Sequence, residues 1–426
     1  MVHHHHHGAS HERQHAVSVR ERVRQSVGSL RYRNFRLLWT TTIFSSSARW
    51  VQQVSLGWLA FDLTDSAALL GVLLFVYQAP TFAMSPLIGV MVDRVDRRKL
   101  FIISQVTMAM VAALLAVDIA TGTVEVWHLY IFALISGFES AIIHVVRQVI
   151  IPAVVPRDEL LNAISLNSAA NTVTRIAGPF LAGLLIVALG VEANFFIQAA
   201  LLACVAVAAF PLQLRAPETD TDEQAAGVSI RDDIAVALRF IWGIGVLRLL
   251  FAVEFLMLFL ASPFTSFLPV WAENVLSLDA DGLGALYAAA GIGSLLGALL
   301  LAAAGNVRRK GVLMLIAGVA LGLAFLGLGS SSLLIVSMVL LAVMGATDAI
   351  ASAINLTLVQ SRVPDGLQGR VMSIFNMGHA LIATGALIMG VIVDAIGIQA
   401  MTLGLGAIVA VLAVFALAAL PTLRRA

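Results

Sequence analysis

The sequence predicts an all-α polytopic membrane protein, with twelve transmembrane helices arranged in two pseudo-symmetric six-helix bundles. Of its 426 residues, 60% are apolar and only 12% are charged, about half the charged share of a typical soluble domain. Long apolar runs separated by short polar segments recur along the chain. The second half of the chain also repeats features of the first half. These observations exclude an ordinary soluble enzyme and a disordered chain.

Each apolar run is expected to be a helix that spans the bilayer. Lipid offers no partner to backbone polar groups, so a spanning segment is either a helix or part of a closed barrel. The runs lack the alternating pattern of barrel strands, and about 20 apolar residues are enough for one helical span. The predicted spans cover residues 35–61, 68–91, 100–121, 126–151, 160–189, 191–213, 246–272, 281–304, 310–330, 332–358, 369–395 and 397–420.

The distribution of Lys and Arg predicts the orientation, because these residues accumulate in cytoplasmic loops. With the N-terminus inside, the six external loops contain neither residue, whereas basic clusters fall at 13–36, 94–99, 308–310 and 424–425 on the cytoplasmic side. Both termini are therefore expected in the cytoplasm.

The spans divide the chain into five parts. A polar stretch separates the sixth span from the seventh, and its second half alternates apolar with charged residues, as a short amphipathic helix or a solvated loop does. The histidine run at 3–7 is an expression tag or a native tract. The predicted parts are a cytoplasmic tail at 1–30, an N-terminal bundle at 31–213, a cytoplasmic linker at 214–245, a C-terminal bundle at 246–420 and a cytoplasmic tail at 421–426.

An internal repeat relates the two bundles at an offset of 207 to 209 positions. Parallel six-helix repeats, related by an axis along the membrane normal, are found in secondary transporters. The matching pairs are Gly89 with Gly297, Glu139 with Asp348, Pro156 with Pro364, and Gly190 with Gly397.

Two motifs resemble those of the major facilitator superfamily. The segment Gly89-Val-Met-Val-Asp93-Arg94-Val-Asp96-Arg97-Arg98-Lys99 resembles its signature loop between helices two and three, with Asp96 where many members have glycine. The segment Gly178-Pro179-Phe180-Leu181-Ala182-Gly183 resembles the helix-five motif of proton-driven exporters, with Ala182 where glycine is usual.

Residues 58–66 and 363–371 are similar to the bacterial branch that contains the enterobactin exporter and the transmembrane secretion effectors. The resemblance covers about residues 30–420. It implies the major facilitator fold, a multi-pass protein of the bacterial cytoplasmic (inner) membrane, and transport, with the helix-five motif favouring export.

The resemblance also implies roles for the two motifs. Asp93 would cap the N-terminal end of the eleventh helix, which is favourable for a carboxylate, and would hold the halves together on the inside. Arg147 could bind Asp93 by a charge-assisted hydrogen bond. Alternatively, the basic residues of the motif only set the topology. The gating group comprises Gly89, Asp93, Arg94, Arg97, Arg98 and Arg147, and the helix-five group comprises Arg175, Gly178, Pro179 and Gly183.

Charged and polar residues inside spans one, four, seven and ten are the candidate transport site. A charge near the bilayer centre costs about 2.5 to 3.5 kcal/mol on insertion scales, so such residues are functional candidates. In the superfamily these four helices line the central cavity, as the resemblance implies. The candidates are Arg49, Gln52, Gln53, Glu139, His144, Glu254, Asp348 and Asn355.

Two roles are expected among these residues. Arg49 is expected to pair with Glu139, and Glu254 or Asp348 is expected to carry the proton, because desolvation favours a neutral acid. The alternative is a set of structural ion pairs between helices, with His144 as an interhelical hydrogen-bonding residue. Asp394, near the external interface, is expected to be solvated.

The sequence thus predicts proton-coupled antiport, in which a small organic molecule such as a siderophore, an antibiotic or another amphipathic compound is exported by alternating access. Import or facilitated diffusion of a solute or lysophospholipid is the alternative, and a non-transporting sensor or scaffold is a more distant one. The expected partners are the substrate, protons and lipid, and the protein is expected to be a monomer.

Other classes of function are not supported. No enzyme is predicted, because no span offers a nucleophile, a base and an orienting partner at helical spacing. The net charge of +1 argues against nucleic-acid binding, which needs a basic face. The single cysteine, Cys204, excludes an internal disulfide and a cysteine-based metal site. No cofactor and no metal are expected.

Overall fold

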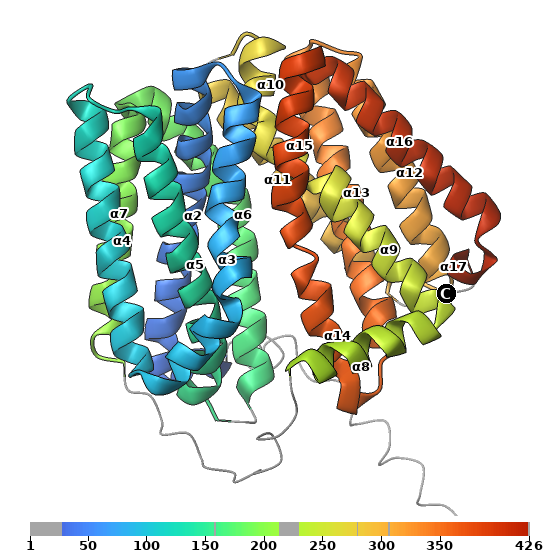
Figure 1. Cartoon of the computed structure of the whole chain (residues 1–426), viewed down its shortest axis with the longest axis horizontal. Helices are drawn as coiled ribbons and strands as arrows, with labels where there is room; N and C mark the ends of the chain where they lie inside the picture. Colours follow the sequence, from blue (N-terminus) through green and yellow to red (C-terminus); the bar gives the residue numbers. More distant parts are fainter. Residues whose placement is uncertain (1–27, 157–158, 213–229, 279, 306, 425–426) are drawn as a thin grey trace, which may run out of the picture.

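The computed structural model describes residues 28–156, 159–212, 230–278, 280–305 and 307–424, and throughout these ranges the regular structure is helical (Figure 1). The N-terminal half contains η2 (Gly28–Arg31), α2 (Arg33–Thr64), α3 (Ala67–Arg94), α4 (Arg97–Ala120), α5 (Val126–Val154), α6 (Leu160–Leu189) and α7 (Val191–Ala209). The C-terminal half contains α8 (Ile230–Gly243), α9 (Gly245–Leu260), η5 (Ser262–Phe267), α10 (Leu268–Asn274), α11 (Ala280–Ala304), α12 (Lys310–Gly329), α13 (Leu334–Gln360), α14 (Asp365–Met377), α15 (Ala380–Ile396), α16 (Ile398–Ala419) and α17 (Pro421–Arg424).

Ten helical segments of the described chain are long and apolar enough to cross a membrane. They coincide with predicted spans three to twelve. The first two predicted spans correspond to α2 and α3, which pack alongside the others, α2 against α6 and α7, and α3 against α5. The protein is therefore a multi-pass, all-helical membrane protein. The count of twelve spans and the cytoplasmic position of the termini stay predictions.

The two halves are built from the same helix pairs. In the N-terminal half α3 packs on α5 and α4 on α7, and in the C-terminal half α11 packs on α13 and α12 on α16. Across the boundary, α3 packs on α15 and α6 packs on α11. These two contacts are equivalent, because α3 matches α11 and α6 matches α15 in the repeat. This pattern is what a sequence repeat of about 208 positions produces when both copies fold alike.

Two matched glycines show the repeat at the level of the backbone. Gly190 ends α6 with φ 89° and ψ 160°, and Gly397 ends α15 with φ 84° and ψ 153°. In each case the glycine N–H donates at 2.8 Å to the carbonyl of the residue four positions earlier, Ile186 or Val393. Side chains with a Cβ avoid this backbone region, so both sharp turns depend on glycine.

Two predicted spans are interrupted rather than continuous. The predicted span at 246–272 is divided into α9, η5 and α10, because Pro263 in the second position of η5 lacks a backbone N–H and cannot continue an α-helix. The predicted span at 369–395 is divided at Gly378, where the ring of Phe255 occupies the space that a Cβ would need. Both breaks lie in the C-terminal half.

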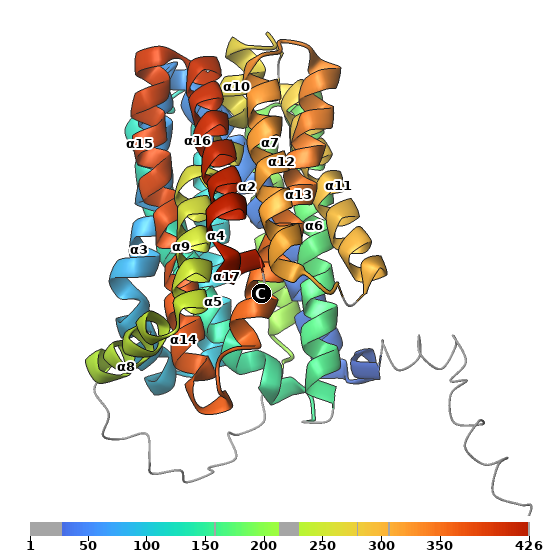
Figure 2. The same ribbon diagram turned by 90° about the vertical axis from the view of Figure 1, so that its right-hand side faces the viewer.

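The halves are joined at the end of the molecule that carries α10 (Figure 1; Figure 2). Gly71 of α3 faces the carbonyl of Ala386, and Gly390 of α15 faces the carbonyl of Ala67, so the two helices approach closely. Small residues at such contacts permit close packing of membrane helices. At the other end, α8 lies across the C-terminal half and packs on α14.

Asp394, at the last turn of α15, binds the N-terminus of α3. Its carboxylate accepts hydrogen bonds from Ala67 N at 2.7 Å, Ala68 N at 3.1 Å and Ser66 Oγ at 2.7 Å. Asp394 is exposed, in line with the expectation that it is solvated, but the sequence did not indicate these three contacts. A carboxylate at a helix N-terminus satisfies free N–H groups and interacts favourably with the helix dipole. Asp394 thus connects the two halves at the α10 end.

Candidate functional site

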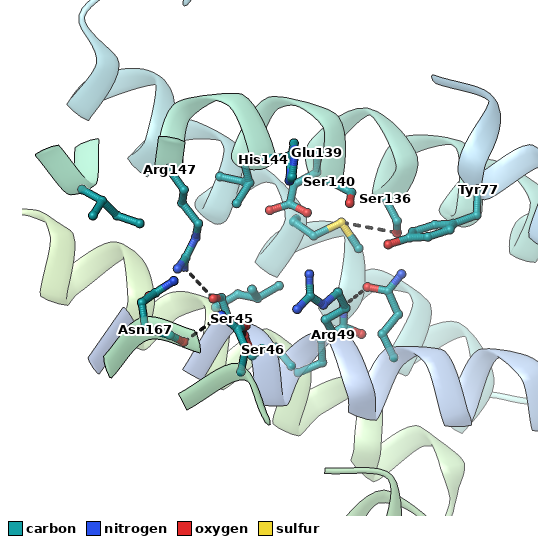
Figure 3. Close-up of a pocket in the computed structure, with 18 residues that line it drawn as sticks. Ser45, Ser46, Arg49, Tyr77, Ser136, Glu139, Ser140, His144, Arg147 and Asn167 are labelled. Atoms are coloured by element: carbon teal, nitrogen blue, oxygen red, sulfur yellow. Dashed lines mark hydrogen bonds between the residues drawn. The ribbon is translucent and has the colours of Figure 1, made fainter. Parts of the chain in front are cut away.

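A polar cavity of about 320 Å³ lies within the N-terminal half, between α2, α5, α6 and α7 (Figure 3). It contains most of the candidate site residues of that half. Its polar lining consists of Ser45, Ser46, Arg49, Gln52, Tyr77, Ser136, Glu139, Ser140, His144, Arg147, Asn167, Asn171 and Gln198. We call this space the N-half cavity.

Arg147 fastens α5 to α2 on one side of this cavity. Its guanidinium donates to Thr42 Oγ1 at 2.6 Å, to Ser45 Oγ at 2.6 Å and to the Thr41 carbonyl at 3.2 Å, and it lies 5.6 Å from the centre of the Phe101 ring. These partners are all neutral. The charge of Arg147 is therefore not cancelled by a direct ion pair within the described residues, although Glu139 interacts with it at longer range.

Glu139 and Arg49 face the same cavity from α5 and α2 (Figure 3), yet the expected ion pair between them is not formed. Glu139 Oε1 instead accepts a hydrogen bond of 2.5 Å from Gln105 Nε2 on α4. Among the residues that the structure describes, Arg49 has no hydrogen bond and no ion pair. It is exposed to the cavity.

The remaining polar residues of the cavity mostly bind one another across helices. Gln198 on α7 donates to Gln52 on α2 at 2.7 Å, and Ser46 donates to Asn171 on α6 at 2.6 Å. Gln52 is buried, whereas His144 is exposed to the cavity. Some of the polar side chains of α2 are thus used for packing within the N-terminal half.

A second cavity, of about 260 Å³, lies between the two halves. Arg175 of α6 enters it and donates to Ser294 Oγ of α11 at 3.0 Å. Gln53 and Pro179 line it from the N-terminal half, and Asp348 of α13 lines it from the C-terminal half. We call this space the central cavity.

The helix-five motif lies where α6 meets its neighbours. Gly178 packs under the side chain of Trp50 on α2, and Gly183 faces Gly284 on α11. Pro179 lies inside α6 without ending the helix. The motif therefore places small residues at contacts on both sides of α6, one within its own half and one across the boundary.

A third cavity, of about 210 Å³, lies within the C-terminal half and is lined mainly by Leu, Met and Ala side chains. Its polar lining includes Glu254, Asp348 and Asn355. Glu254 Oε2 accepts a hydrogen bond of 2.5 Å from Asn355 Nδ2. Asp348 has no hydrogen bond or ion pair to any residue of the described ranges and is exposed. Asp348 is also one of three residues, with Ser262 and Leu321, that this C-half cavity shares with the central cavity, and it is the charged one.

The signature loop is described only in part. Gly89, Asp93 and Arg94 lie within α3, but their side chains are outside the described residues, so the expected contacts of Asp93 with Arg147 and the eleventh helix are not observable. Arg97 begins α4. Arg98 donates to the Phe210 carbonyl and stacks 5.4 Å from its ring centre, which ties α4 to the end of α7 within one half.

Two hydrogen bonds at the site, from Gln105 to Glu139 and from Arg175 to Ser294, could not be predicted from the sequence. Gln105 lies in an apolar span and is neutral, so hydropathy does not single it out as the partner of Glu139. Ser294 is one of many small residues of α11 and binds Arg175 only because α6 and α11 meet.

Comparison with known proteins agrees with this architecture. The family model described as the Major Facilitator Superfamily matches residues 38–384. The staphyloferrin A transporter of Staphylococcus aureus is 24% identical over 84% of this chain and 90% of its own. The enterobactin exporter of Shigella boydii is 26% identical, covering 84% and 86%. The multidrug efflux pump Tap of Mycolicibacterium fortuitum is 27% identical, covering 87% and 91%.

Solved structures show the same fold. A bacterial homologue of the human lysosomal transporter Spinster superposes with a TM-score of 0.71 at 17% identity, over 92% of this chain and 98% of the other. The nucleoside transporter NupG gives a TM-score of 0.70 at 16% identity, over 91% and 98% of the two chains.

Proposed function

Because the chain belongs to the Major Facilitator Superfamily, whose members are transporters and not enzymes, we propose that it exports a small organic molecule across the bacterial inner membrane in exchange for protons. Relatives named as a siderophore exporter and an efflux pump support the direction. The observation that carries the proton coupling is the position of Asp348, an acid without a hydrogen bond within the described residues, where two cavities meet.

Asp348 fits the role of proton carrier better than Glu254. Glu254 is held by Asn355 at 2.5 Å, whereas Asp348 faces the central cavity that Arg175 enters from the other half. An ionised Asp348 attracts Arg175 across the boundary, and a proton on Asp348 removes that attraction. Proton binding would thus weaken the electrostatic attraction between α13 and α6 and would favour the change from one conformation to the other.

The proposed cycle is alternating access between the two halves. With the orientation predicted from the basic loops, the α10 end is external, and Asp394 holds that end together. The conformation described here would then be one in which substrate enters from the cytoplasm. The protein is proposed to act as a monomer in lipid.

Flux measurements in vesicles of known orientation test this proposal. Protein is reconstituted so that its cytoplasmic face is outward, with enterobactin, staphyloferrin A and a panel of antibiotics as candidate substrates. Export predicts substrate accumulation inside the vesicle when the lumen is acidic, together with alkalinisation of the lumen. Substrate movement that does not depend on the pH gradient would instead establish facilitated diffusion. Substrate that leaves the lumen together with the protons would establish import.

A further inference from the structure

The charge distribution of the N-half cavity carries an inference about the substrate, which rests on the transport function proposed above. The cavity contains two arginines, Arg49 and Arg147, and one acid, Glu139. Arg147 is bound only to hydroxyl and carbonyl oxygens in the described residues, and Glu139 is bound to Gln105. Glu139 interacts through its charge with both arginines, but two cations against one acid leave the cavity with an excess of positive charge, which favours a negative ligand.

Arg49 is the group that a ligand would contact. Among the described residues it has no hydrogen bond and no ion pair, and it is exposed to the cavity. A guanidinium carries five N–H donors and stays charged in proteins. A charge at membrane depth is normally compensated by a partner. Within the described residues Glu139 acts on Arg49 only at longer range and forms no ion pair with it, so a bound anion would supply the direct partner.

Neighbouring groups suit the same kind of ligand. Ser140 and His144 line the cavity from α5, and Ser45 lines it from α2 beside Arg147 (Figure 3). Hydroxyl groups and a histidine ring can donate hydrogen bonds to anionic oxygens. The planar fork of a guanidinium matches the two oxygens of a carboxylate or a phosphate. The volume of about 320 Å³ is enough for a small organic anion.

We propose that the exported molecule carries a carboxylate or phosphate group and that Arg49 binds this group in the N-half cavity. The rest of a larger substrate would extend toward the apolar surfaces between the halves. A cationic compound would be repelled by the two arginines. The two cavities then serve different ions, with the substrate anion in the N-terminal half and the proton at Asp348.

The single cysteine of the chain allows a direct measurement of the cavity's charge preference. In a Cys204→Ser background, Ser140→Cys places one thiol in the cavity. Two methanethiosulfonate reagents of similar size, the anionic sulfonatoethyl and the cationic trimethylammonioethyl compound, are compared with Arg49 present and with Arg49→Gln. Each rate is divided by the rate with free cysteine to remove intrinsic reactivity.

The anionic reagent is expected to react roughly tenfold faster than the cationic one, and Arg49→Gln should remove most of that preference, as one unit charge several ångströms away predicts. Arg49→Lys keeps the charge and should keep the preference, which separates the charge from damage to the fold. Equal rates for both reagents, an unchanged ratio in Arg49→Gln, or no reaction with either reagent would overturn the proposal.

Protection of the same thiol identifies the anion. Benzoate that slows the modification, when benzamide does not, assigns a carboxylate, and inorganic phosphate that slows it assigns a phosphate. Equal protection by benzoate and benzamide, or protection by neither anion, argues against an anion site. These measurements need no transport, so a cavity that prefers anions in a protein that moves no protons would contradict only the export mechanism.

Discussion

The N-half cavity and the C-half cavity are lined in common by the first, fourth and sixth helices of each repeat, α2, α5 and α7 in one and α9, α13 and α16 in the other. A comparable contact between the first and fourth helices is present in both. In the N-terminal half Arg147 donates to Ser45, 102 positions earlier, at 2.6 Å, and in the C-terminal half Asn355 donates to Glu254, 101 positions earlier, at 2.5 Å. Arg147 and Asn355 are themselves 208 positions apart. Equivalent pairs of helices therefore hold a cation, Arg147, in the first half and an acid, Glu254, in the second half.

This difference shows how a duplicated fold can divide two tasks. The position that matches Arg49 at an offset of 208 is Met257, which lines the apolar C-half cavity. Glu139 and Asp348 also match, but only Glu139 has a hydrogen-bond partner in the described residues. Within those residues, the N-terminal half thus offers a cation and the C-terminal half an acid that has no hydrogen bond or ion pair, and we call these two groups the free cation and the free acid. Substrate binding and proton transfer can be altered separately by variants in the two halves.

The largest expected effect comes from removing the free acid. Asp348→Asn keeps the size of the side chain but cannot exchange a proton, so proton-driven export should fall to the level of vesicles without protein. Exchange of substrate across the membrane without a pH gradient should persist, because the substrate contacts are unchanged. Glu254→Gln, with its amide partner retained, should lose export only in part. Full export by Asp348→Asn would assign the proton to another residue.

The second effect concerns the free cation. Arg49→Gln should weaken the binding of an anionic substrate by about 10- to 100-fold, the usual value of a hydrogen bond to a charged group. Calorimetric titration of purified protein measures this change. Asp348→Asn should bind the same substrate almost as the parent does. Equal loss of affinity in both variants would mean that the substrate anion and the proton bind at one site. The proposed division of the two tasks between the halves would then be wrong.

Arg147 has a structural role that its C-terminal counterpart performs with a weaker donor. Arg147→Gln loses the hydrogen bonds to Thr42 and Ser45, which should destabilise the folded protein by about 1 to 3 kcal/mol. Thermal melting in detergent should show a lower midpoint, with Arg49→Gln as the matched variant that removes the same charge without losing a contact to the described residues. A similar loss of stability in both variants would contradict this distinction.

Much of this architecture was predictable, because hydropathy and charge act over whole spans. Spans three to twelve coincide with the helical segments, and the matched glycines at 190 and 397 form two equivalent turns. Individual contacts were less predictable. Arg49 and Glu139 were expected to pair because both lie deep within their spans, but Gln105 on a neighbouring helix binds Glu139 instead. Which side chain comes closest depends on helix rotation, which one sequence does not determine.

The contact of Asp394 was missed for the same reason and gives the smallest expected effect. It depends on the close approach of α15 to α3, which small residues such as Gly71 and Gly390 permit. The presence of these glycines in the sequence does not show which helices will meet. The matching position in the first half, 208 residues earlier, is Ile186, so only one of the two equivalent helix ends carries this acid. Asp394 therefore favours the conformation that is joined at the α10 end.

Asp394→Ala should shift the conformational equilibrium away from this state by roughly two- to thirtyfold, because losing a helix cap costs about 0.5 to 2 kcal/mol. Distances between spin labels on paired cysteines at the α10 end, in the Cys204→Ser background, measure the shift. Asp394→Asn, which retains one acceptor oxygen, should shift it less. Asp118→Ala is the matched control, because Asp118 binds His128 within the N-terminal half. An equal shift in Asp118→Ala would show that the effect comes from lost surface charge and not from the contact between α15 and α3.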